Sequence, residues 1–428
     1  MSALALGAYS LLLWLVQPAY ALRLWRRGRV EALYRHALGE RFGFYGRRDG
    51  DERRGDAGWV WVHAVSLGET RAAAALIDAL RAARPGMKLL LTHGTATGRE
   101  AGASLLRDGD VQVWLPFDTP GATRRFFTHF RPAVGVLMET EIWPNLLREA
   151  ERARVPVVSA NARLSARSLR RGLRLDALMR PAARRVTLAL AQTDADALRL
   201  REAGAPRVEV SGNLKFDMTP EPALLERGHA WHALLAREVV LAASTREGEE
   251  TMLLDAWLKT PAPRPLLLIV PRHPQRFDEV AGLVAAAGLT LARRSGWGDA
   301  PPHEALGAEV WLGDSMREMA LYYAVAQVAL LGGSFAPLGG QNLIEAAACG
   351  CPVVAGPHTF NFAEAAELAI EAGAALRVAD IAAGVATARA LLAAPMRLAD
   401  AAARSSAFAL QHQGAAARMA QRILSLIR

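Results

Sequence analysis

The chain has few cysteines and lacks the motifs of the common metal and nucleophile sites. Its two cysteines, Cys349 and Cys351, lie one residue apart beside Gly350 and Pro352, which disfavours a disulfide between them. The sequence contains no HExxH, zinc-type cysteine spacing, Walker motif, GxGxxG or G-x-S-x-G. We therefore expect no metal site and no acyl-transfer nucleophile, and nothing requires an oxidising compartment.

Lysine is also scarce, because the chain has 51 Lys+Arg and only three of them are lysines. The charge is unevenly spread along the sequence. Residues up to Lys215 include 34 Lys+Arg and 21 Asp+Glu, whereas the residues after it include 17 Lys+Arg and 21 Asp+Glu. A solvated basic face is one explanation. The other is an anionic partner, such as a phosphorylated lipid, a membrane surface or nucleic acid.

The first charged residue is Arg23, so the chain opens with an uninterrupted apolar run that is followed by Arg26, Arg27 and Arg29. About 20 apolar residues are enough to span a bilayer. Because the positive charge follows the run instead of preceding it, we interpret the segment as a retained anchor with the rest of the chain in the cytoplasm. Pro18 leaves open whether the segment spans the bilayer or lies in one leaflet.

Length and composition predict two globular domains, since 428 residues exceed one hydrophobic core and 52% of them are hydrophobic. Short apolar runs alternate with helical patterns, which predicts two doubly wound parallel sheets joined by a hinge at residues 212–222. The predicted strands are Trp59–Val65, Lys88–Thr92, Val111–Leu115, Val134–Met138, Val155–Ser159, Thr187–Ala191, Val208–Val210, Val239–Ala242, Leu266–Val270, Leu289–Ala292, Val310–Leu312, Val328–Leu331 and Val353–Ala355.

Four turns after predicted strands carry a cap residue three positions ahead of a glutamate. Such pairs form capping boxes at helix N-termini, and this structural role is one explanation for all four. However, the carboxyl ends of parallel strands are also where ligands bind, so the four glutamates are candidate site residues. The pairs are Ser66 with Glu69, Ser244 with Glu247, Ser315 with Glu318, and Asn342 with Glu345.

The strongest candidate for a phosphate site is the glycine-rich stretch at residues 330–357, where a strand ends and a helix begins near Asn342. Exposed amides and a helix N-terminus suit an anion, and Glu345 is placed to bind ribose hydroxyls. Packing glycines are the alternative. The segment IVPRHPQRF adds Arg272, His273 and Arg276, which suit a phosphate or carboxylate or are simply solvated.

Three further residues stand out near the ends of the first domain's strands. Lys215 is one of only three lysines and lies at the predicted hinge, where it could stabilise a leaving phosphate. Glu139 and Glu141 follow a strand, and carboxylates this close are costly unless a cation or substrate hydroxyls share them. In contrast, Asp194 and Asp196 form a DxD pattern that Thr193 explains as a helix cap.

Together these motifs resemble those of the bacterial Kdo transferases, membrane-associated enzymes of lipopolysaccharide biosynthesis. The resemblance spans nearly the whole chain and includes HAVSLGET, METEIWPN, NARLSARS, GNLKFD, STREGEE, IVPRHPQRF, GDSMREM and GGQNLIEAAACGCPVVAGPHTFNF, in that order. It implies an α/β GT-B glycosyltransferase with two Rossmann-like doubly wound domains facing a cleft, plus an N-terminal membrane anchor helix. The expected domains are residues 1–30 for the anchor, 31–215 for acceptor binding and the catalytic base, and 216–428 for the CMP-sugar donor.

The resemblance also implies a reaction. Kdo, an eight-carbon acidic sugar, would move from CMP-Kdo to a hydroxyl of a phosphorylated lipid A precursor, with inversion at the anomeric carbon. The reaction would take place at the cytoplasmic side of the inner membrane, where the enzyme contacts the inner leaflet. No cofactor, metal or nucleic acid is expected to take part. The implied base is Glu69, and the implied transition-state stabilisers are Glu139 and Lys215. The implied donor contacts are Pro271, Arg272, Met316, Arg317, Glu318, Asn342, Leu343, Ile344 and Glu345.

Three positions depart from the family pattern: Arg317 replaces the usual glycine, and Arg246 and Gln341 stand where histidine is common. The first departure puts the donor contact near Glu318 in doubt. Two rival functions stay open. One is a GT-B transferase using a UDP-sugar, which competition by CMP and UDP would distinguish, and the other is a membrane-tethered binder of anionic polymers that leaves the clustered glutamates unexplained.

Overall fold

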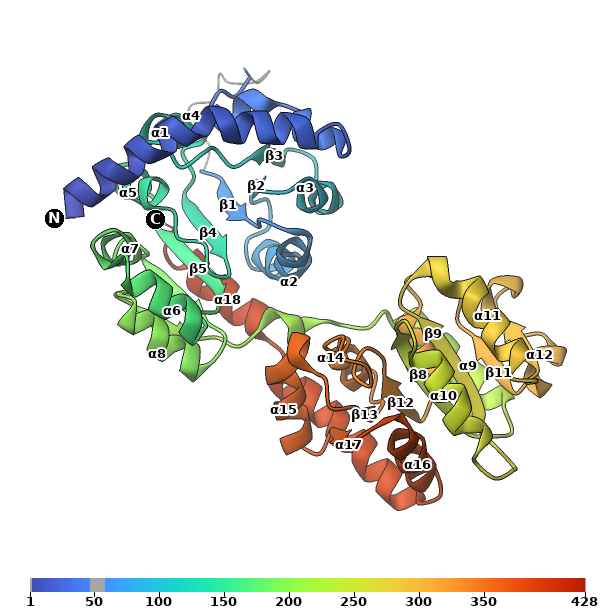
Figure 1. The fold of residues 1–428 in the computed structure, drawn as a ribbon. Helices are drawn as coiled ribbons and strands as arrows, with labels where there is room; N and C mark the ends of the chain where they lie inside the picture. The colour runs from blue at the N-terminus through green and yellow to red at the C-terminus, as the bar shows by residue number, and fades with distance from the viewer. Residues whose placement is uncertain (1, 47–57, 428) are drawn as a thin grey trace. The chain divides into compact units, whose positions relative to one another are not determined.

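The computed structural model describes residues 2–46 and 58–427, and these form two compact units. Unit 1 comprises Met1–Asp217 and Gln413–Arg428, and unit 2 comprises Met218–His412. Each unit contains one seven-stranded sheet in which every strand pairing is parallel (Figure 1). The two parallel-sheet domains predicted from the alternating pattern are therefore present.

The unit 1 sheet has the order β3-β2-β1-β4-β5-β6-β7. Its strands are β1 (Val60–His63), β2 (Leu89–His93), β3 (Val111–Trp114), β4 (Val134–Met138), β5 (Val157–Ala162), β6 (Leu188–Ala191) and β7 (Val208–Val210). The helices of the unit are α1 (Ser2–Arg27), α2 (Leu67–Ala83), α3 (Ala96–Ala103), α4 (Pro120–Phe130), α5 (Pro144–Arg152), α6 (Ala166–Leu173), α7 (Asp176–Ala183), α8 (Asp194–Glu202) and α18 (Ala415–Leu424), with 3-10 turns η1 (Ala32–Arg35), η2 (Leu38–Phe42) and η3 (Leu214–Asp217).

The unit 2 sheet has the order β10-β11-β9-β8-β12-β13-β14. Its strands are β8 (Val239–Thr245), β9 (Leu266–Pro271), β10 (Leu291–Arg293), β11 (Val310–Leu312), β12 (Val328–Leu331), β13 (Val353–Ala355) and β14 (Ala375–Arg377). The helices are α9 (Pro222–Leu234), α10 (Glu249–Leu258), α11 (Phe277–Ala286), α12 (His303–Gly307), α13 (Met319–Val325), α14 (Leu343–Ala348), α15 (Ala363–Glu371), α16 (Ile381–Leu392) and α17 (Pro395–His412), with 3-10 turns η4 (Pro274–Arg276), η5 (Arg294–Gly296) and η6 (Phe360–Phe362).

Each predicted strand has a counterpart, within a few residues at its ends. The strand that the sequence did not indicate is β14, whose residues Ala-Leu-Arg lack the β-branched side chains typical of strands. It pairs with β13 at the sheet edge, so its backbone pairing comes from tertiary structure. Both cysteines are free thiols, as their spacing indicates.

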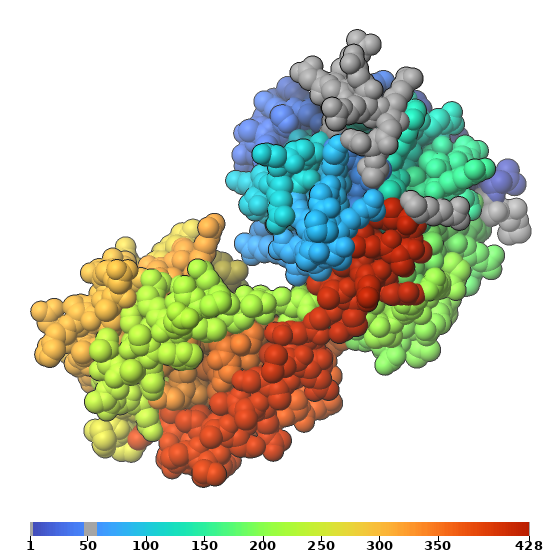
Figure 2. Space-filling view, turned by 180° about the vertical axis from the view of Figure 1, so that it is seen from behind, coloured from blue at the N-terminus to red at the C-terminus, as the bar shows by residue number. Residues whose placement is uncertain are grey.

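The C-terminal segment differs from the predicted domain boundaries, which placed residues 216–428 in one domain. Helix α18 packs against α2 and η3 of unit 1 (Figure 2). Its Arg422 binds Glu209 through Nε at 2.7 Å and Nη2 at 2.6 Å. Asp217 accepts hydrogen bonds from the amides of Gly414 and Ala416. Met419 and Ile423 are fully buried in the unit 1 core, so the chain returns to unit 1 to complete it.

Helix α1 lies along one side of unit 1 (Figure 1). Leu24 is buried against Tyr34 and Ala96, and the Tyr20 ring packs edge-on against Phe117. The helix is long and apolar enough to cross a membrane, and only 6% of its most apolar window is buried. One side of α1 is thus attached to the unit, while most of its apolar surface is exposed.

Candidate active site

The SLGE turn connects β1 to α2 and holds Glu69 in a defined position. Ser66 is the N-cap of α2, and its Oγ accepts a hydrogen bond from the Glu69 N–H at 3.5 Å. In return, Glu69 accepts hydrogen bonds from the Val65 N–H at 2.8 Å and from the Ser66 hydroxyl at 3.0 Å. The predicted capping pair is therefore present, and it orients the carboxylate at the carboxyl end of the sheet.

Glu69 belongs to a group of three carboxylates in unit 1. Burial raises the pKa of Glu69, the hydrogen bonds from Val65 and Ser66 oppose that rise, and the charge of Glu139 adds to it. Burial raises the pKa of Glu141 to about 7, and the charges of Glu69 and Glu139 contribute in the same direction. The structure thus brings together the glutamates of SLGE and METE, which are 70 residues apart along the chain at Glu69 and Glu139.

Glu139 has a strained backbone, with φ at +56° immediately after β4. Its N–H donates to the Ala160 carbonyl at 2.9 Å, and its own carbonyl accepts from the Ser159 hydroxyl at 3.0 Å. A non-glycine residue in this region costs about 1–2 kcal/mol and persists where neighbouring contacts enforce it. Such strain is common at functional sites, which agrees with the role that the family resemblance implies for Glu139.

Lys215 also belongs to unit 1 and follows β7 within η3. Leu214 and Phe216 on either side are buried, whereas Lys215 itself is exposed. The Asn161 side chain accepts from the Leu214 N–H at 3.0 Å, and the Asn213 side chain accepts from the Lys215 N–H at 3.0 Å. Asn161 thereby fixes the turn that presents Lys215, a positioning contact between NARL and GNLK that sequence reasoning missed.

The candidate donor residues belong to unit 2 and follow three strands of its sheet. Pro271 ends β9, Met316 follows β11, and Asn342 lies beyond β12 at the N-cap of α14, where its side chain accepts from the Ile344 N–H at 3.1 Å. Leu343 and Ile344 are each 1% exposed, so their side chains pack in the core and do not face a ligand. Helix α14 has only six residues, so the dipole at its N-terminus is that of a short helix.

Arg272 and Glu345 interact electrostatically within this region. Burial raises the pKa of Glu345, and the positive charge of Arg272 opposes the rise. Arg272 is exposed, and its N–H donates to the Thr245 carbonyl at 2.9 Å. Arg276 is different, since it is buried and pairs with Glu250 at 2.7 Å and Glu279 at 2.9 Å. Arg276 is therefore a structural residue and not an available phosphate ligand.

The Ser244–Glu247 capping prediction is wrong. Helix α10 begins only at Glu249, after Gly248 with φ at +87°, and Glu247 is exposed. The important residue of STREGEE is Glu249, which is 1% exposed. Its carboxylate accepts from four backbone amides, those of Arg246, Gly333, Phe335 and Ala336, at 2.6–3.2 Å. Glu249 thereby holds the glycine-rich loop, a role that the sequence spacing did not reveal.

The Ser315–Glu318 pair is not a capping box either, because α13 begins at Met319 and Glu318 itself takes the N-cap position. The Glu318 carboxylate is occupied by Arg227 at 2.8 Å, Arg294 at 2.9 Å and the Ser315 hydroxyl at 2.5 Å. These partners hold the pKa of Glu318 below its usual range although burial opposes them. Glu318 is therefore better suited to shaping its turn than to binding a ligand.

The Asn342–Glu345 pair is only half realised. Asn342 caps α14, but among the described residues no return hydrogen bond joins the Glu345 side chain to the Asn342 amide. Arg317, which replaces the family's usual glycine, has φ at +65°. This left-handed conformation explains why glycine is favoured at the position. Within residues 2–46 and 58–427, no cluster of His, Cys, Asp and Glu side chains is arranged to hold a metal ion.

Comparison with known proteins gives a consistent picture. Residues 36–218 match the family model described as 3-deoxy-D-manno-octulosonic-acid transferase (kdotransferase). The chain is 48% identical to the 3-deoxy-D-manno-octulosonic acid transferase of Bordetella pertussis, over 96% of this chain and 97% of that protein. It is 35% identical to the enzyme of the same name from Haemophilus influenzae, over 86% of each chain.

Among solved structures, Anabaena HepE in complex with UDP is similar at a TM-score of 0.56 and 16% identity, over 86% of this chain and 99% of that one. At this identity the similarity concerns the fold alone, and it agrees with two Rossmann-like domains. The match to the Bordetella enzyme covers nearly the whole chain, and the residues matched by the family model include Glu69, Glu139 and Lys215. The chain therefore belongs to the family of 3-deoxy-D-manno-octulosonic acid (Kdo) transferases.

Proposed function

We propose that the protein is an inverting GT-B glycosyltransferase that moves Kdo from CMP-Kdo to a hydroxyl of a lipid A precursor. The observation that carries this proposal is a cluster of three carboxylates, in a chain of the Kdo transferase family. The three are Glu69, Glu139 and Glu141, at the carboxyl end of the unit 1 sheet. A half-buried carboxylate with a raised pKa, oriented by two hydrogen bonds, suits a general base.

In the proposed step, the ionised Glu69 removes the proton of the acceptor hydroxyl while its oxygen attacks the anomeric carbon of Kdo. The bond from that carbon to the phosphate oxygen breaks, and CMP leaves with the bonding electrons. Attack from the side opposite the leaving group inverts the anomeric carbon. Glu139 stabilises the positive charge that develops on the sugar, and Lys215 stabilises the negative charge on the departing phosphate.

Unit 2 binds the donor in this proposal. Arg272 is exposed and contacts the phosphate, while Glu345 binds the ribose hydroxyls. Met316, Arg317 and Asn342 complete the nucleotide site together with Pro271, and the buried Leu343 and Ile344 support it from the core. Glu318 holds the turn of Arg317 through its two arginine partners. Because CMP carries a single phosphate, two cationic side chains can neutralise it, and we propose that no divalent metal is needed.

Helix α1 is the proposed membrane anchor, at the cytoplasmic side of the inner membrane. In the first half of the helix, the Tyr9 hydroxyl donates to Asp118 at 2.9 Å and the Ser10 hydroxyl donates to Asn145 at 3.1 Å. Asp118 and Asn145 are buried residues of unit 1, so α1 is attached to the unit along its length. This attachment supports a helix that lies in the membrane interface, with Leu11 and Leu15 facing the lipid.

Mass spectrometry of the products from CMP-Kdo and a lipid A precursor tests donor, acceptor and copy number together. The expected result is a mass increase of one or more Kdo units and release of CMP. CMP is expected to inhibit competitively and UDP is not, and activity is expected to survive EDTA. Loss of activity on chelation, restored by one added metal, would reject the metal-free scheme, and absence of any Kdo adduct would reject the proposed function.

A further inference from the structure

An apolar cavity of about 440 Å³ lies in unit 1 beneath α6 and α7. Its wall is formed by aliphatic side chains from α6, α7, α8 and the loops beside them, including Leu164, Leu169, Leu173, Met179 and Leu200. This volume falls within the range of small-molecule sites and exceeds the voids that well-packed cores leave. The cavity is large enough to admit a ligand, and its lining selects an apolar one.

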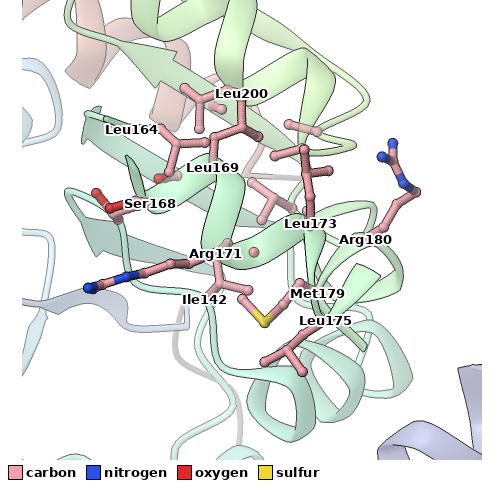
Figure 3. Close-up of a pocket in the computed structure, with 18 of the residues that line it drawn as sticks. Ile142, Leu164, Ser168, Leu169, Arg171, Leu173, Leu175, Met179, Arg180 and Leu200 are labelled. Carbon is pink, nitrogen blue, oxygen red and sulfur yellow. The ribbon is translucent and has the colours of Figure 1, made fainter. Parts of the chain in front are cut away.

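Glu139, one of the three clustered glutamates, contributes to the lining of the cavity together with Thr140 and Ser159. Leu175 and Asp176 line both this cavity and a smaller one against Ala5, Ala8, Tyr9 and Leu12 of α1. The cavity is therefore bordered both by residues that contact the proposed membrane helix and by the proposed catalytic residue Glu139. Figure 3 shows Ile142, Leu175 and Met179 gathered at the same end of the cavity.

Helix α6, which forms part of the cavity wall and contributes Arg171 to its lining, is strongly basic on its exposed side. Helix α6 and its flanks carry five exposed arginines, with no acidic residue between the first and the last: Arg163, Arg167, Arg170, Arg171 and Arg174. In the part of the chain that the structure describes, none of the five pairs with a carboxylate. In Figure 3 the guanidinium group of Arg171 extends away from the apolar interior. An apolar cavity beside a cationic helix is complementary to a lipid chain attached to an anionic headgroup.

We propose that this cavity takes one fatty acyl chain of the phosphorylated acceptor lipid while the arginines of α6 bind its phosphate. The inference rests on the proposed function and adds the part of the acceptor that unit 1 recognises. A fatty acyl chain that moves from the membrane into an apolar cavity gains little hydrophobic free energy, since both surroundings are apolar. The cavity therefore acts by orienting the acceptor hydroxyl toward Glu69 and by selecting acyl chains that fit.

Two substitutions would fill the cavity from different elements. Gly172 in α6 lines the cavity, and a β-carbon there would have no heavy atom within 4 Å, so the first atom of the side chain in Gly172→Phe meets no clash. Ala183→Leu enlarges a buried lining residue at the end of α7. Gly282→Phe is the matched control, because Gly282 lies in α11 of unit 2 and also has open space around its β-carbon.

Calorimetric titration with myristic acid below its critical micelle concentration tests the cavity directly. We expect saturable binding of one chain by the wild type and by Gly282→Phe. Excluding two methylenes lowers affinity by about tenfold, so Gly172→Phe and Ala183→Leu are expected to bind at least about tenfold more weakly. No saturable binding by the wild type, or equal binding by the filled variants, would overturn the proposal.

Transfer assays provide a second test, with an acylated and a chemically deacylated acceptor. The filled variants are expected to raise KM for the acylated acceptor by about tenfold and to leave KM for the deacylated one unchanged. An equal change for both acceptors would overturn the proposal. If the wild type transfers Kdo to neither acceptor, the proposed function fails. The fatty acid titration still shows independently whether the cavity binds an acyl chain.

Discussion

Replacing Glu69 by glutamine separates its two roles, as a helix cap and as the proposed base. The carboxylate accepts from the Val65 N–H at 2.8 Å and from the Ser66 hydroxyl at 3.0 Å. In Glu69→Gln, the amide oxygen can still accept from Val65, and the amide nitrogen can donate to Ser66 once that hydroxyl reverses. Both hydrogen bonds survive, so the free energy of unfolding is expected to change by less than about 1 kcal/mol.

Turnover should respond very differently, because a carboxamide cannot take a proton from the acceptor. General-base catalysis contributes about 10²–10⁴-fold, so kcat of Glu69→Gln is expected to fall by at least about 10²-fold. CMP affinity is expected to stay within about twofold, since Glu69 is not among the proposed nucleotide contacts. Single-turnover transfer with labelled CMP-Kdo measures the first quantity, and calorimetric titration with CMP measures the second.

Asp196 offers a matched control, because it forms the same kind of cap with Thr193 at the start of α8. Asp196→Asn perturbs a capping carboxylate in the same unit without touching Glu69. It is expected to lower stability, because it also weakens the ion pair with Arg199, and to leave kcat nearly unchanged. Substantial turnover by Glu69→Gln, or an equal loss in both variants, would refute the assignment of Glu69 as the base.

Three further outcomes follow from unit geometry and charge. Arg317→Gly relieves a left-handed residue and is expected to raise the free energy of unfolding by about 0.5–1 kcal/mol, measured by urea denaturation of unit 2; a loss of stability would contradict the strain argument. Glu249→Ala leaves four amides of the glycine-rich loop without their acceptor and is expected to cost about 3 kcal/mol or more, with faster amide exchange at Gly333, whereas unchanged exchange would show that the loop holds itself. Folding raises the pKa of Glu141 from 4.5 to about 7, so the folded state holds that proton more tightly and stability falls as pH rises across this interval. Glu141→Gln removes this loss, so denaturation curves are expected to show a free energy of unfolding about 1 kcal/mol above that of the wild type at pH 8, after allowance for solvent screening, and a similar value at pH 4.5. A difference that does not depend on pH would contradict this assignment of the pKa.

Local signals predicted the features that depend on a few neighbouring residues. Ser66 three positions before Glu69 indicated a cap, and the structure has that cap with the carboxylate engaged in return. The same spacing misled at Ser244, because the backbone continues through Gly248 at positive φ before α10 begins. A capping pattern does not reveal whether the residues between its two ends are helical, and only the turn geometry decides that.

Contacts between distant segments could not be predicted from local patterns. Glu249 holds the loop at Gly333, 84 residues away, and Asn161 holds Leu214, 53 residues away. Both are polar side chains whose partners are backbone amides, and backbone amides leave no trace in the sequence. The sequence did not predict that α18 packs in unit 1, for a related reason. The apolar pattern of an amphipathic helix shows which of its faces is buried but not which hydrophobic core that face packs against.

By itself, the sequence determined the alternation of strands and helices, the apolar first helix, the basic first half and the motifs of the Kdo transferase family. These properties depend on residue type and spacing along the chain, because buried positions favour apolar residues and helix ends favour capping side chains. Tertiary structure alone decided that Glu69, Glu139 and Glu141 share one electrostatic environment and that an apolar cavity opens beside them. Shared environments and unfilled volume depend on how elements pack in three dimensions, and no single segment of the chain encodes that packing.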